Sequence, residues 1–223
     1  MNDTFHDRQD AGRAVASMLS AYQGAPDLLV LGLPRGGVPV AAEVAQLLGA
    51  PMDVLVVRKV GMPGHAEFAL GAIAAVDGQA ATVRNDAAAQ LLGRGFQDAF
   101  DHVAEQEHHE LRRRQQQYRG DRGPLALTGK TVILVDDGLA TGATMRAAIE
   151  AVTQLQPARL IAAVPVSSRE AAAEISALVD EFICVQTPPL FRAVGRAYES
   201  FDQTTDEEVQ RLLEDRRDDP RLR

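Results

Sequence analysis

The feature that most constrains the fold is a run of four apolar residues, 132–135, which ends abruptly in two adjacent aspartates, Asp136 and Asp137. A parallel strand covered on both faces has a continuous apolar run, whereas a strand with one face in solvent alternates apolar and polar residues. A turn rich in glycine and threonine follows, and then a helix-compatible stretch at 145–155. This order predicts an open α/β sheet that binds its ligand beyond the carboxyl ends of the strands.

The turn after the aspartates has the composition of an anion-binding loop. Its glycines allow backbone conformations in which successive N–H groups converge on one anion, and its threonines offer hydroxyl groups in the same place. The first turn of the following helix adds unpaired N–H donors and the positive end of the helix dipole. We therefore expect a phosphate monoester here. The residues of the expected phosphate cradle are Gly138, Ala140, Thr141, Gly142, Ala143 and Thr144.

The two aspartates need a different partner, because they would repel a bare phosphate. Carboxylates at a strand end can accept hydrogen bonds from a sugar diol or hold Mg²⁺ through water. A ribose 5-phosphate satisfies both halves of the motif. A Walker A loop fits less well, since Gly138 and Gly142 are one residue too close and no lysine follows Gly142.

At residues 132–144 the sequence resembles the phosphoribosyl pyrophosphate signature of the type I phosphoribosyltransferases. In that family two acids bind the ribose hydroxyls and the next loop cradles the 5-phosphate, roles that the resemblance gives to Asp136, Asp137 and residues 140–144. The resemblance runs from about Phe5 to Leu213 and is greatest with an uncharacterised bacterial branch. It implies the fold and the donor, phosphoribosyl pyrophosphate, but no acceptor.

A second buried-strand pattern, 28–33, leads through Pro34 into the turn Arg35-Gly36-Gly37 and then into an apolar helix pattern at 38–48. A tight turn that exposes its backbone and carries one cation suits an anion. In the family the turn after the first core strand is the pyrophosphate loop, so the resemblance assigns Arg35, Gly36 and Gly37 to pyrophosphate. The alternative is a simple strand-to-helix turn with a surface arginine.

A third strand pattern, 53–57, ends in two cations, Arg58 and Lys59. Cations at this edge could neutralise a leaving pyrophosphate, the point at which electrostatic catalysis is greatest. Lysine and arginine are also common at solvated strand ends, and that alternative stays open. Glu67 is a candidate Mg²⁺ ligand or general base on the acceptor, although a helix-capping role explains it equally well.

Composition narrows the class further. At 223 residues and 46% hydrophobic, the chain can bury a full core as one domain, or as one domain with a subdomain. One cysteine, Cys184, excludes an internal disulfide and favours a reducing, cytoplasmic location. No 18-residue apolar stretch exists and residues 1–7 are polar, so we expect neither a membrane span nor a signal peptide. A formal net charge of −8 argues against a broad nucleic-acid surface.

We expect an α/β fold with a mostly parallel open sheet and helices on both faces, the type I phosphoribosyltransferase fold. Residues 1–61 and 128–214 form this core, 62–127 form a helical insertion, and 215–223 form a frayed tail. Pro165 and Pro188-Pro189 are predicted to end the last two strands. The expected core elements are a helix at 11–22, strands at 28–33 and 53–57, a helix at 38–48, a strand at 132–135, helices at 145–155 and 169–178, and strands at 160–164 and 181–185.

The insertion carries a long helical pattern that begins after a capping Asn85 or Asp86, is broken at Gly93 and Gly95, and reaches Tyr118. In the family this position is the hood, which covers the active site and selects the acceptor. Closure of such a lid excludes water and so protects the donor from hydrolysis. The cations 112–114 could touch pyrophosphate or a partner subunit, but a solvated helix face is the favoured interpretation.

The acceptor is constrained by one departure from the family. Members that act on 6-oxopurines place an aspartate where this chain has Ala140, which cannot transfer a proton, so hypoxanthine, guanine and xanthine are disfavoured. Adenine-type members have Ala-Thr-Gly there, as this chain does, which permits adenine without establishing it. Near the C-terminus, Gly195 and Tyr198 could stack on a planar acceptor, although packing onto the core is the favoured use of this aromatic segment.

The leading hypothesis is a Mg²⁺-dependent phosphoribosyltransferase, in which a nitrogenous acceptor displaces pyrophosphate from C1 of the donor with inversion. Asp136 and Asp137 would also hold Mg²⁺ through water. Two alternatives stay open: a regulatory protein that binds phosphoribosyl pyrophosphate or a nucleotide without turnover, and a hydrolase that releases pyrophosphate to water. Nucleic acid is not an expected partner, and a homodimer is allowed.

Overall fold

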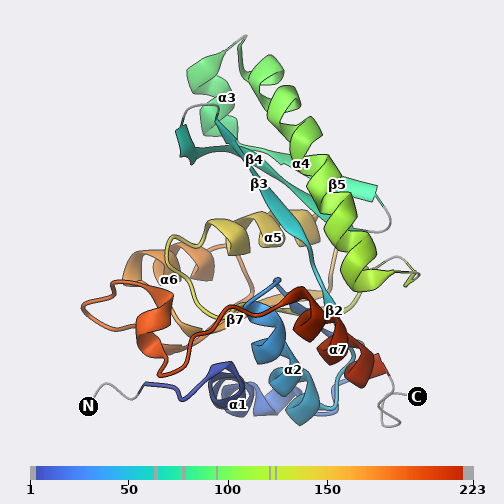
Figure 1. Ribbon diagram of the computed structural model, residues 1–223, viewed down its shortest axis with the longest axis vertical. Helices are drawn as coiled ribbons and strands as arrows, with labels where there is room; N and C mark the ends of the chain where they lie inside the picture. The colour runs from blue at the N-terminus through green and yellow to red at the C-terminus, as the bar shows by residue number, and fades with distance from the viewer. Residues whose placement is uncertain are drawn as a thin grey trace.

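The computed structural model describes residues 4–62, 65–76, 79–93, 95–120, 122–123 and 125–217. Within these residues a five-stranded sheet has the order β2-β1-β6-β7-β8, and every neighbouring pair in it is parallel. Figure 1 places this sheet in the lower, layered part of the molecule. Its elements are α1 (Arg8–Met18), a 3₁₀ turn (Ser20–Tyr22), β1 (Leu28–Gly32), α2 (Gly37–Leu48), β2 (Met52–Val54), β6 (Thr131–Val135), α5 (Ala143–Thr153), β7 (Arg159–Val166), α6 (Arg169–Ser176), β8 (Glu181–Gln186), a second 3₁₀ turn (Val194–Ala197) and α7 (Asp206–Arg217). The predicted α/β class is confirmed.

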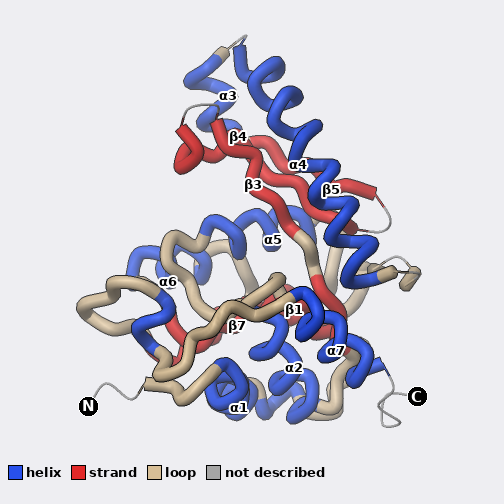
Figure 2. Tube along the Cα trace, viewed as in Figure 1, coloured by secondary structure: helices blue, strands red, loops and turns tan. Residues whose placement is uncertain are grey.

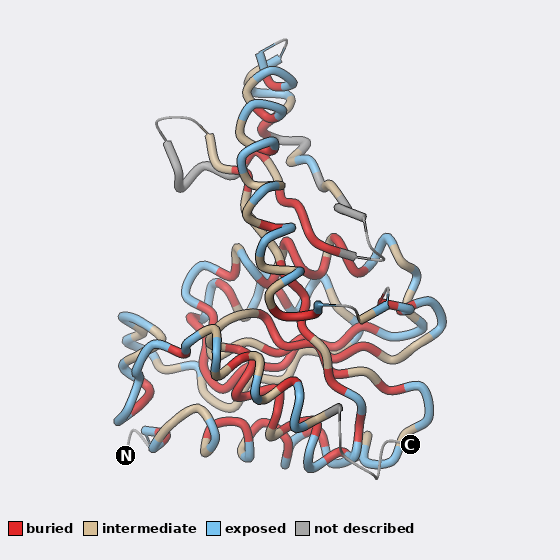
Figure 3. Tube along the Cα trace, turned by 45° about the vertical axis from the view of Figure 1, so that its right-hand side comes forward, coloured by how far each residue is buried: buried red, intermediate tan, exposed pale blue. Residues whose placement is uncertain are grey.

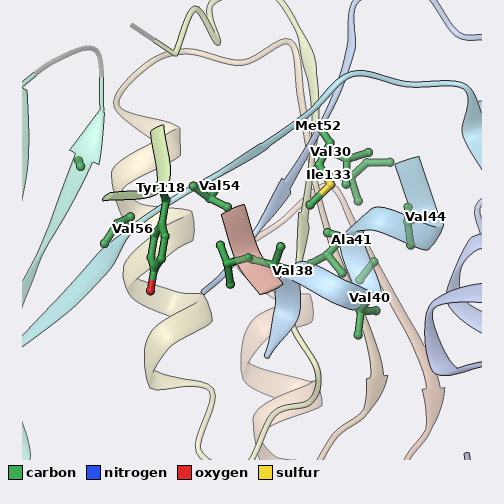
Figure 4. Packing of buried hydrophobic residues seen from close by; sticks show 14 of the residues in the cluster. Val30, Val38, Val40, Ala41, Val44, Met52, Val54, Val56, Tyr118 and Ile133 are labelled. Atoms are coloured by element: carbon green, nitrogen blue, oxygen red, sulfur yellow. The ribbon is translucent and has the colours of Figure 1, made fainter. Parts of the chain in front are cut away.

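The central strands are buried on both faces, which explains their continuous apolar sequences. In β6, Val132 and Leu134 pack with α5 on one face, whereas Ile133 and Val135 pack with α2 on the other. Figure 2 shows the layers, with α1 and α2 below the sheet and α5 and α6 above it. Figure 4 shows Ile133 meeting the side chains of α2. Each such buried side chain stabilises the fold by about 1.5–3 kcal/mol, so the site stands at the edge of a rigid platform.

The strand expected at 53–57 is in fact divided between two sheets, and the prediction of one strand is wrong. The core strand β2 ends at Val54, and β3 (Val57–Met62) belongs to a separate antiparallel sheet. Leu55 and Val56 between them are 0% and 1% exposed. A continuous apolar run has no period to mark where the chain leaves one sheet for the other.

The insertion contains a sheet that the sequence analysis did not predict. Strands β3, β4 (His65–Val76) and β5 (Gln79–Arg84) form it, and helices α3 (Asp86–Leu92) and α4 (Gly95–Arg119) follow. Alanine-rich strands such as β4 carry a weak β signal, because alanine is depleted in strands. The long helical pattern is confirmed, and Asn85 caps it by accepting a hydrogen bond of 3.2 Å from the amide of Ala88. Figure 3 shows α4 buried along one side and exposed along the other.

Smaller differences lie at element ends. Strand β7 continues through Pro165, with its register to β8 running from Val164–Cys184 to Val166–Gln186. Strand β8 ends before Pro188-Pro189, as predicted. Helix α7 extends three residues into the predicted tail, to Arg217, and residues 218–223 lie outside the described part. None of the helices in the described residues is long and apolar enough to cross a membrane.

Candidate active site

The two aspartates lie at the carboxyl end of β6, in the middle of the sheet between β1 and β7. The amide of Asp137 donates a hydrogen bond of 2.9 Å to Oδ1 of Asp136. Burial and the neighbouring carboxylate of Asp137 raise the pKa of Asp136 well above its ordinary value. Burial also raises the pKa of Asp137, but the Arg8 guanidinium opposes that rise. Charging both acids at once is therefore costly without a cation or a ligand.

The loop after the aspartates presents unused donors. Within the described residues the backbone N–H groups of residues 140–142 and of Thr144 have no hydrogen-bond partner. The hydroxyl-bearing residues Thr141 and Thr144 are exposed beside them. Gly142 has φ +71°, a left-handed conformation that favours glycine. Together with Asp136 and Val194, this loop lines an open pocket at the start of α5.

The position of the loop is set by strand β7 and helix α6. The amide of Leu139 donates to the carbonyl of Val166 at 2.9 Å, and the Ser168 hydroxyl donates to the carbonyl of Ala140 at 2.8 Å. The Ser168 hydroxyl also caps α6 by accepting from the amide of Ala171. One serine therefore fixes both the helix and the loop, which leaves the loop amides facing the pocket.

The turn 35–37 packs directly against the acidic pair. A Cβ on Gly36 would lie 1.9 Å from Oδ2 of Asp137, and one on Gly37 would lie 2.6 Å from the carbonyl oxygen of Val135. Only glycine fits at either position. The amide of Leu33 also donates to the carbonyl of Val135 at 2.9 Å. The structure thus brings the two motifs, about a hundred residues apart in sequence, into contact.

The predicted pyrophosphate-side cations have internal partners or different positions. Arg35 lies 3.7 Å from Asp206 of α7, which also accepts a hydrogen bond from the Tyr118 hydroxyl. Arg58 is on β3 rather than at the end of a core strand, and its Nε donates to Glu107 of α4 at 2.6 Å. Successive strand residues face opposite sides of a sheet, so Lys59 lies on the side away from Arg58.

The structure places the remaining residues named in the sequence analysis in different parts of the molecule. Glu67 is on β4, in the antiparallel sheet, and its side chain lies outside what the structure describes. Tyr198 packs between the rings of Phe5 and Phe201, with centroid distances of 5.7 and 4.9 Å, and it is 6% exposed. Its ring is therefore a core element, as favoured, and not a stacking platform. The Cys184 thiol is partly buried, and burial raises its pKa to about 11.

The two aspartates fit a magnesium ion only in part. The described residues contain no group of three or more His, Cys, Asp and Glu side chains that could hold a metal by themselves. Mg²⁺ commonly takes one or two carboxylates and completes its shell with water and substrate phosphates. Asp136 and Asp137 supply that number of carboxylates beside the open pocket.

The sequence analysis missed two residues that contact the motifs, Arg8 and Asp206, and it missed the contact of the Tyr198 hydroxyl. Nε of Arg8 in α1 donates to Oδ2 of Asp137 at 2.9 Å, and Nη2 forms an ion pair with the same oxygen at 2.9 Å. The Tyr198 hydroxyl donates to the carbonyl of Asp137 at 2.6 Å, and Asp206 pairs with Arg35. No local pattern predicts these contacts, because each joins segments that are far apart in the sequence.

Comparison with known proteins gives the class. A family model described as a phosphoribosyl transferase domain matches residues 1–197. The chain therefore belongs to the phosphoribosyl transferase domain family, and the resemblance drawn from the sequence is confirmed.

Individual relatives agree with this class. Two strains of Mycobacterium tuberculosis have a protein that is provisionally named a phosphoribosyl transferase. It is 44% identical to this chain over a match that covers 94% of this chain and 46% of its own length. The chain thus spans about half the length of these curated relatives. The crystal structure of TT1426 from Thermus thermophilus superposes with a TM-score of 0.84 at 42% identity, covering 94% of this chain and 97% of that one. A stretch of 42 residues is 57% identical to the bifunctional protein PyrR of Chloroflexus aurantiacus, which is 18% of this chain and 23% of that protein.

Proposed function

We propose that the protein transfers the 5-phosphoribosyl group of phosphoribosyl pyrophosphate to a nitrogenous acceptor and releases pyrophosphate in a Mg²⁺-dependent reaction. The observation that carries this proposal is the contact between three different ligand-binding elements. A loop whose N–H groups have no partner among the described residues, an acidic pair and a glycine turn meet at one edge of the sheet. Each element suits a different part of this donor.

The roles follow from the chemistry of each element. The 5-phosphate would accept hydrogen bonds from the free amides and hydroxyls of residues 140–144, at the positive end of α5. The ribose 2- and 3-hydroxyls would donate to the carboxylates of Asp136 and Asp137. The turn 35–37, held against these carboxylates, would bind the pyrophosphate. These assignments place C1 of the ribose between the acidic pair and the turn.

Bond cleavage at C1 leaves negative charge on the departing pyrophosphate and positive charge on the ribose. Arg35 and Lys59 are the cations proposed to stabilise the negative charge on the pyrophosphate. The carboxylates of Asp136 and Asp137 are proposed to stabilise the positive charge on the ribose. A bound Mg²⁺, held by Asp136 and Asp137 with water, would neutralise further charge on the pyrophosphate. Ala140 lines the pocket without any group able to move a proton, which supports an acceptor other than a 6-oxopurine.

The test is pyrophosphate release from phosphoribosyl pyrophosphate with Mg²⁺, measured with a panel of nitrogenous bases and with none. Release that depends on one base supports the transferase and identifies its acceptor. Equal release with and without a base contradicts the transferase in favour of a hydrolase. Donor binding by calorimetry without any release would contradict turnover and leave a binding protein.

A further inference from the structure

A second cavity lies where strands β7 and β8 end, beside the candidate site. Two arginines, Arg192 and Arg196, line it, and none of the described residues around it is an aspartate or a glutamate. Most of its wall is apolar and comes from Val166, Pro188, Leu190, Phe191, Ala193 and Ala197. The cavity thus combines an apolar wall with positive charge.

The arginines of this cavity differ from those of the candidate site. Arg8 and Arg35 each pair with a carboxylate of the protein. Neither Arg192 nor Arg196 has a side-chain hydrogen bond, an ion pair or a ring contact within the described part of the chain. Acidic side chains outnumber basic ones by 31 to 23 in this chain, so a shortage of carboxylates does not explain the missing partners.

The wall that carries the arginines is held in place by the backbone on one side and by an aromatic ring on the other. The amide of Phe5 donates to the carbonyl of Ala197 at 2.8 Å, and the amide of Glu199 donates to the carbonyl of Phe5 at 2.9 Å. A Cβ on Gly195 would lie 2.7 Å from Cδ1 of Phe201, so the turn packs closely on that ring. This part of the cavity is formed before a ligand arrives, which reduces the ordering cost of binding.

A thin wall separates the cavity from the phosphate loop. Ala193 lines the cavity, whereas the next residue, Val194, lines the phosphate pocket. A Cβ on Gly138 would lie 2.6 Å from Cγ1 of Val194 and 2.9 Å from Cγ1 of Val166, which shows how closely the loop packs on this wall. A ligand in the cavity would therefore lie beside the phosphate loop and not in it.

We propose that this cavity binds a small aromatic carboxylate, with its ring against the apolar wall and its carboxylate on Arg192 and Arg196. Guanidinium groups bind carboxylates through two parallel hydrogen bonds, and ligand pockets combine apolar walls with a few polar groups that fix orientation. A neutral ring would leave the cations without a partner, and an inorganic anion would leave the apolar wall without a contact. The inference does not depend on the proposed function, because the cavity lies outside the phosphate pocket.

The experiment is calorimetric titration of benzene and pyridine carboxylates, each beside its neutral carboxamide, into wild type, Arg192→Gln, Arg196→Gln and the double variant. We expect a carboxylate to bind at least about 10-fold more tightly than its carboxamide. Each single substitution should weaken carboxylate binding by about 3- to 10-fold, and the double substitution by more, with carboxamide binding unchanged. Both side chains are exposed, so the melting temperatures should equal that of wild type.

The matched control is Arg211→Gln, which removes an exposed arginine of α7 outside the cavity. It should bind the carboxylate like wild type. Ala193→Leu keeps both arginines but adds bulk to the wall, so it should weaken binding of the carboxylate and of the carboxamide alike. The inference is overturned by equal affinity for the two compounds, by wild-type affinity in the double variant, or by the same loss in Arg211→Gln.

Pyrophosphate release from phosphoribosyl pyrophosphate then distinguishes two sources of the carboxylate. An acceptor needs a ring nitrogen, whose lone pair forms the bond to C1 while the C1–O bond breaks and its electron pair leaves with pyrophosphate. Such a compound is consumed in step with the release. An effector changes the rate and is recovered intact, and a benzene carboxylate can act only in this way. If wild type releases no pyrophosphate with any compound, the proposed function fails, whereas carboxylate binding that depends on Arg192 and Arg196 still supports the site.

Discussion

The two sides of the candidate site differ in how ready they are for a ligand. On the phosphate side, the amides of residues 140–142 have no partner among the described residues, and the loop is held by bonds from β7 and α6. On the pyrophosphate side, Arg35 is paired with Asp206 at 3.7 Å. One side is built from backbone and is already open. The other depends on the side chain of Arg35, which is paired with a carboxylate of the protein.

This difference has an energetic consequence. A ligand on the phosphate side displaces no partner of the loop amides among the described residues, whereas pyrophosphate must compete with the carboxylate of Asp206 for Arg35. An exposed pair of this kind is worth about 0.2–1 kcal/mol, so the competition is modest for Arg35, whose side chain is 31% exposed. Because Arg35 can exchange Asp206 for pyrophosphate, the affinity of the pyrophosphate side depends on the neighbouring carboxylate. The phosphate side is fixed by the strand register.

The largest effect is expected from Asp136→Asn combined with Asp137→Asn. Loss of two charge-assisted hydrogen bonds to the ribose should reduce donor turnover by roughly 10²- to 10⁴-fold. Binding of inorganic phosphate, measured by calorimetry, should stay equal or become stronger, because two negative charges leave the pocket. Unchanged turnover would remove the acidic pair from the site, and lost phosphate binding would mean that the loop depends on it.

A smaller effect should separate the neighbouring cations of β3. Arg58 is held by Glu107 at 2.6 Å, and Lys59 lies on the opposite side of the sheet, where Val57 packs with α5. Lys59→Gln is expected to weaken pyrophosphate binding, measured by calorimetry, by about 10-fold, and Arg58→Gln by less than about 3-fold. The reverse order would place Arg58, and not Lys59, against the pyrophosphate.

The smallest effect tests the competition itself. Asp206→Asn keeps the contact with Tyr118 but releases Arg35, so pyrophosphate affinity should rise by about 2- to 5-fold. Ribose 5-phosphate affinity should not change, because that ligand uses the other side. Glu207→Gln removes a charge from the same first turn of α7 and serves as the control. A rise in both variants would indicate a general charge effect rather than release of Arg35.

Sequence reasoning succeeded where the relevant chemistry is contiguous. Strand β6, the two acids, the loop and helix α5 follow one another, so apolar run, carboxylates and glycines could be interpreted together. The same holds for β1 and the turn before α2, which the structure brings against the acids. In these segments local sequence and tertiary position carry the same information.

Sequence reasoning failed where a contact joins distant segments or where an apolar run has no periodicity. Arg8 and Asp137 are separated by 129 positions, and nothing around Arg8 distinguishes it from a helix-start arginine. The run through Leu55 and Val56 is apolar in both sheets that it connects, so its break could not be located. Strand β4 is rich in alanine, a residue that favours helices over strands.

The close packing of the turn 35–37 on the acids has a consequence for anyone surveying this protein with a library of all single substitutions. Position 36 has no space for even one added carbon, since that atom would fall 1.9 Å from the carboxylate oxygen of Asp137. Every replacement there should score as poorly as replacing the acid itself, although glycine has no functional group. Neighbouring Arg35, which is partly exposed, should instead show a graded profile that follows charge. The substitution data at position 36 would thus report the lack of space in the site, and those at position 35 would report its need for a positive charge.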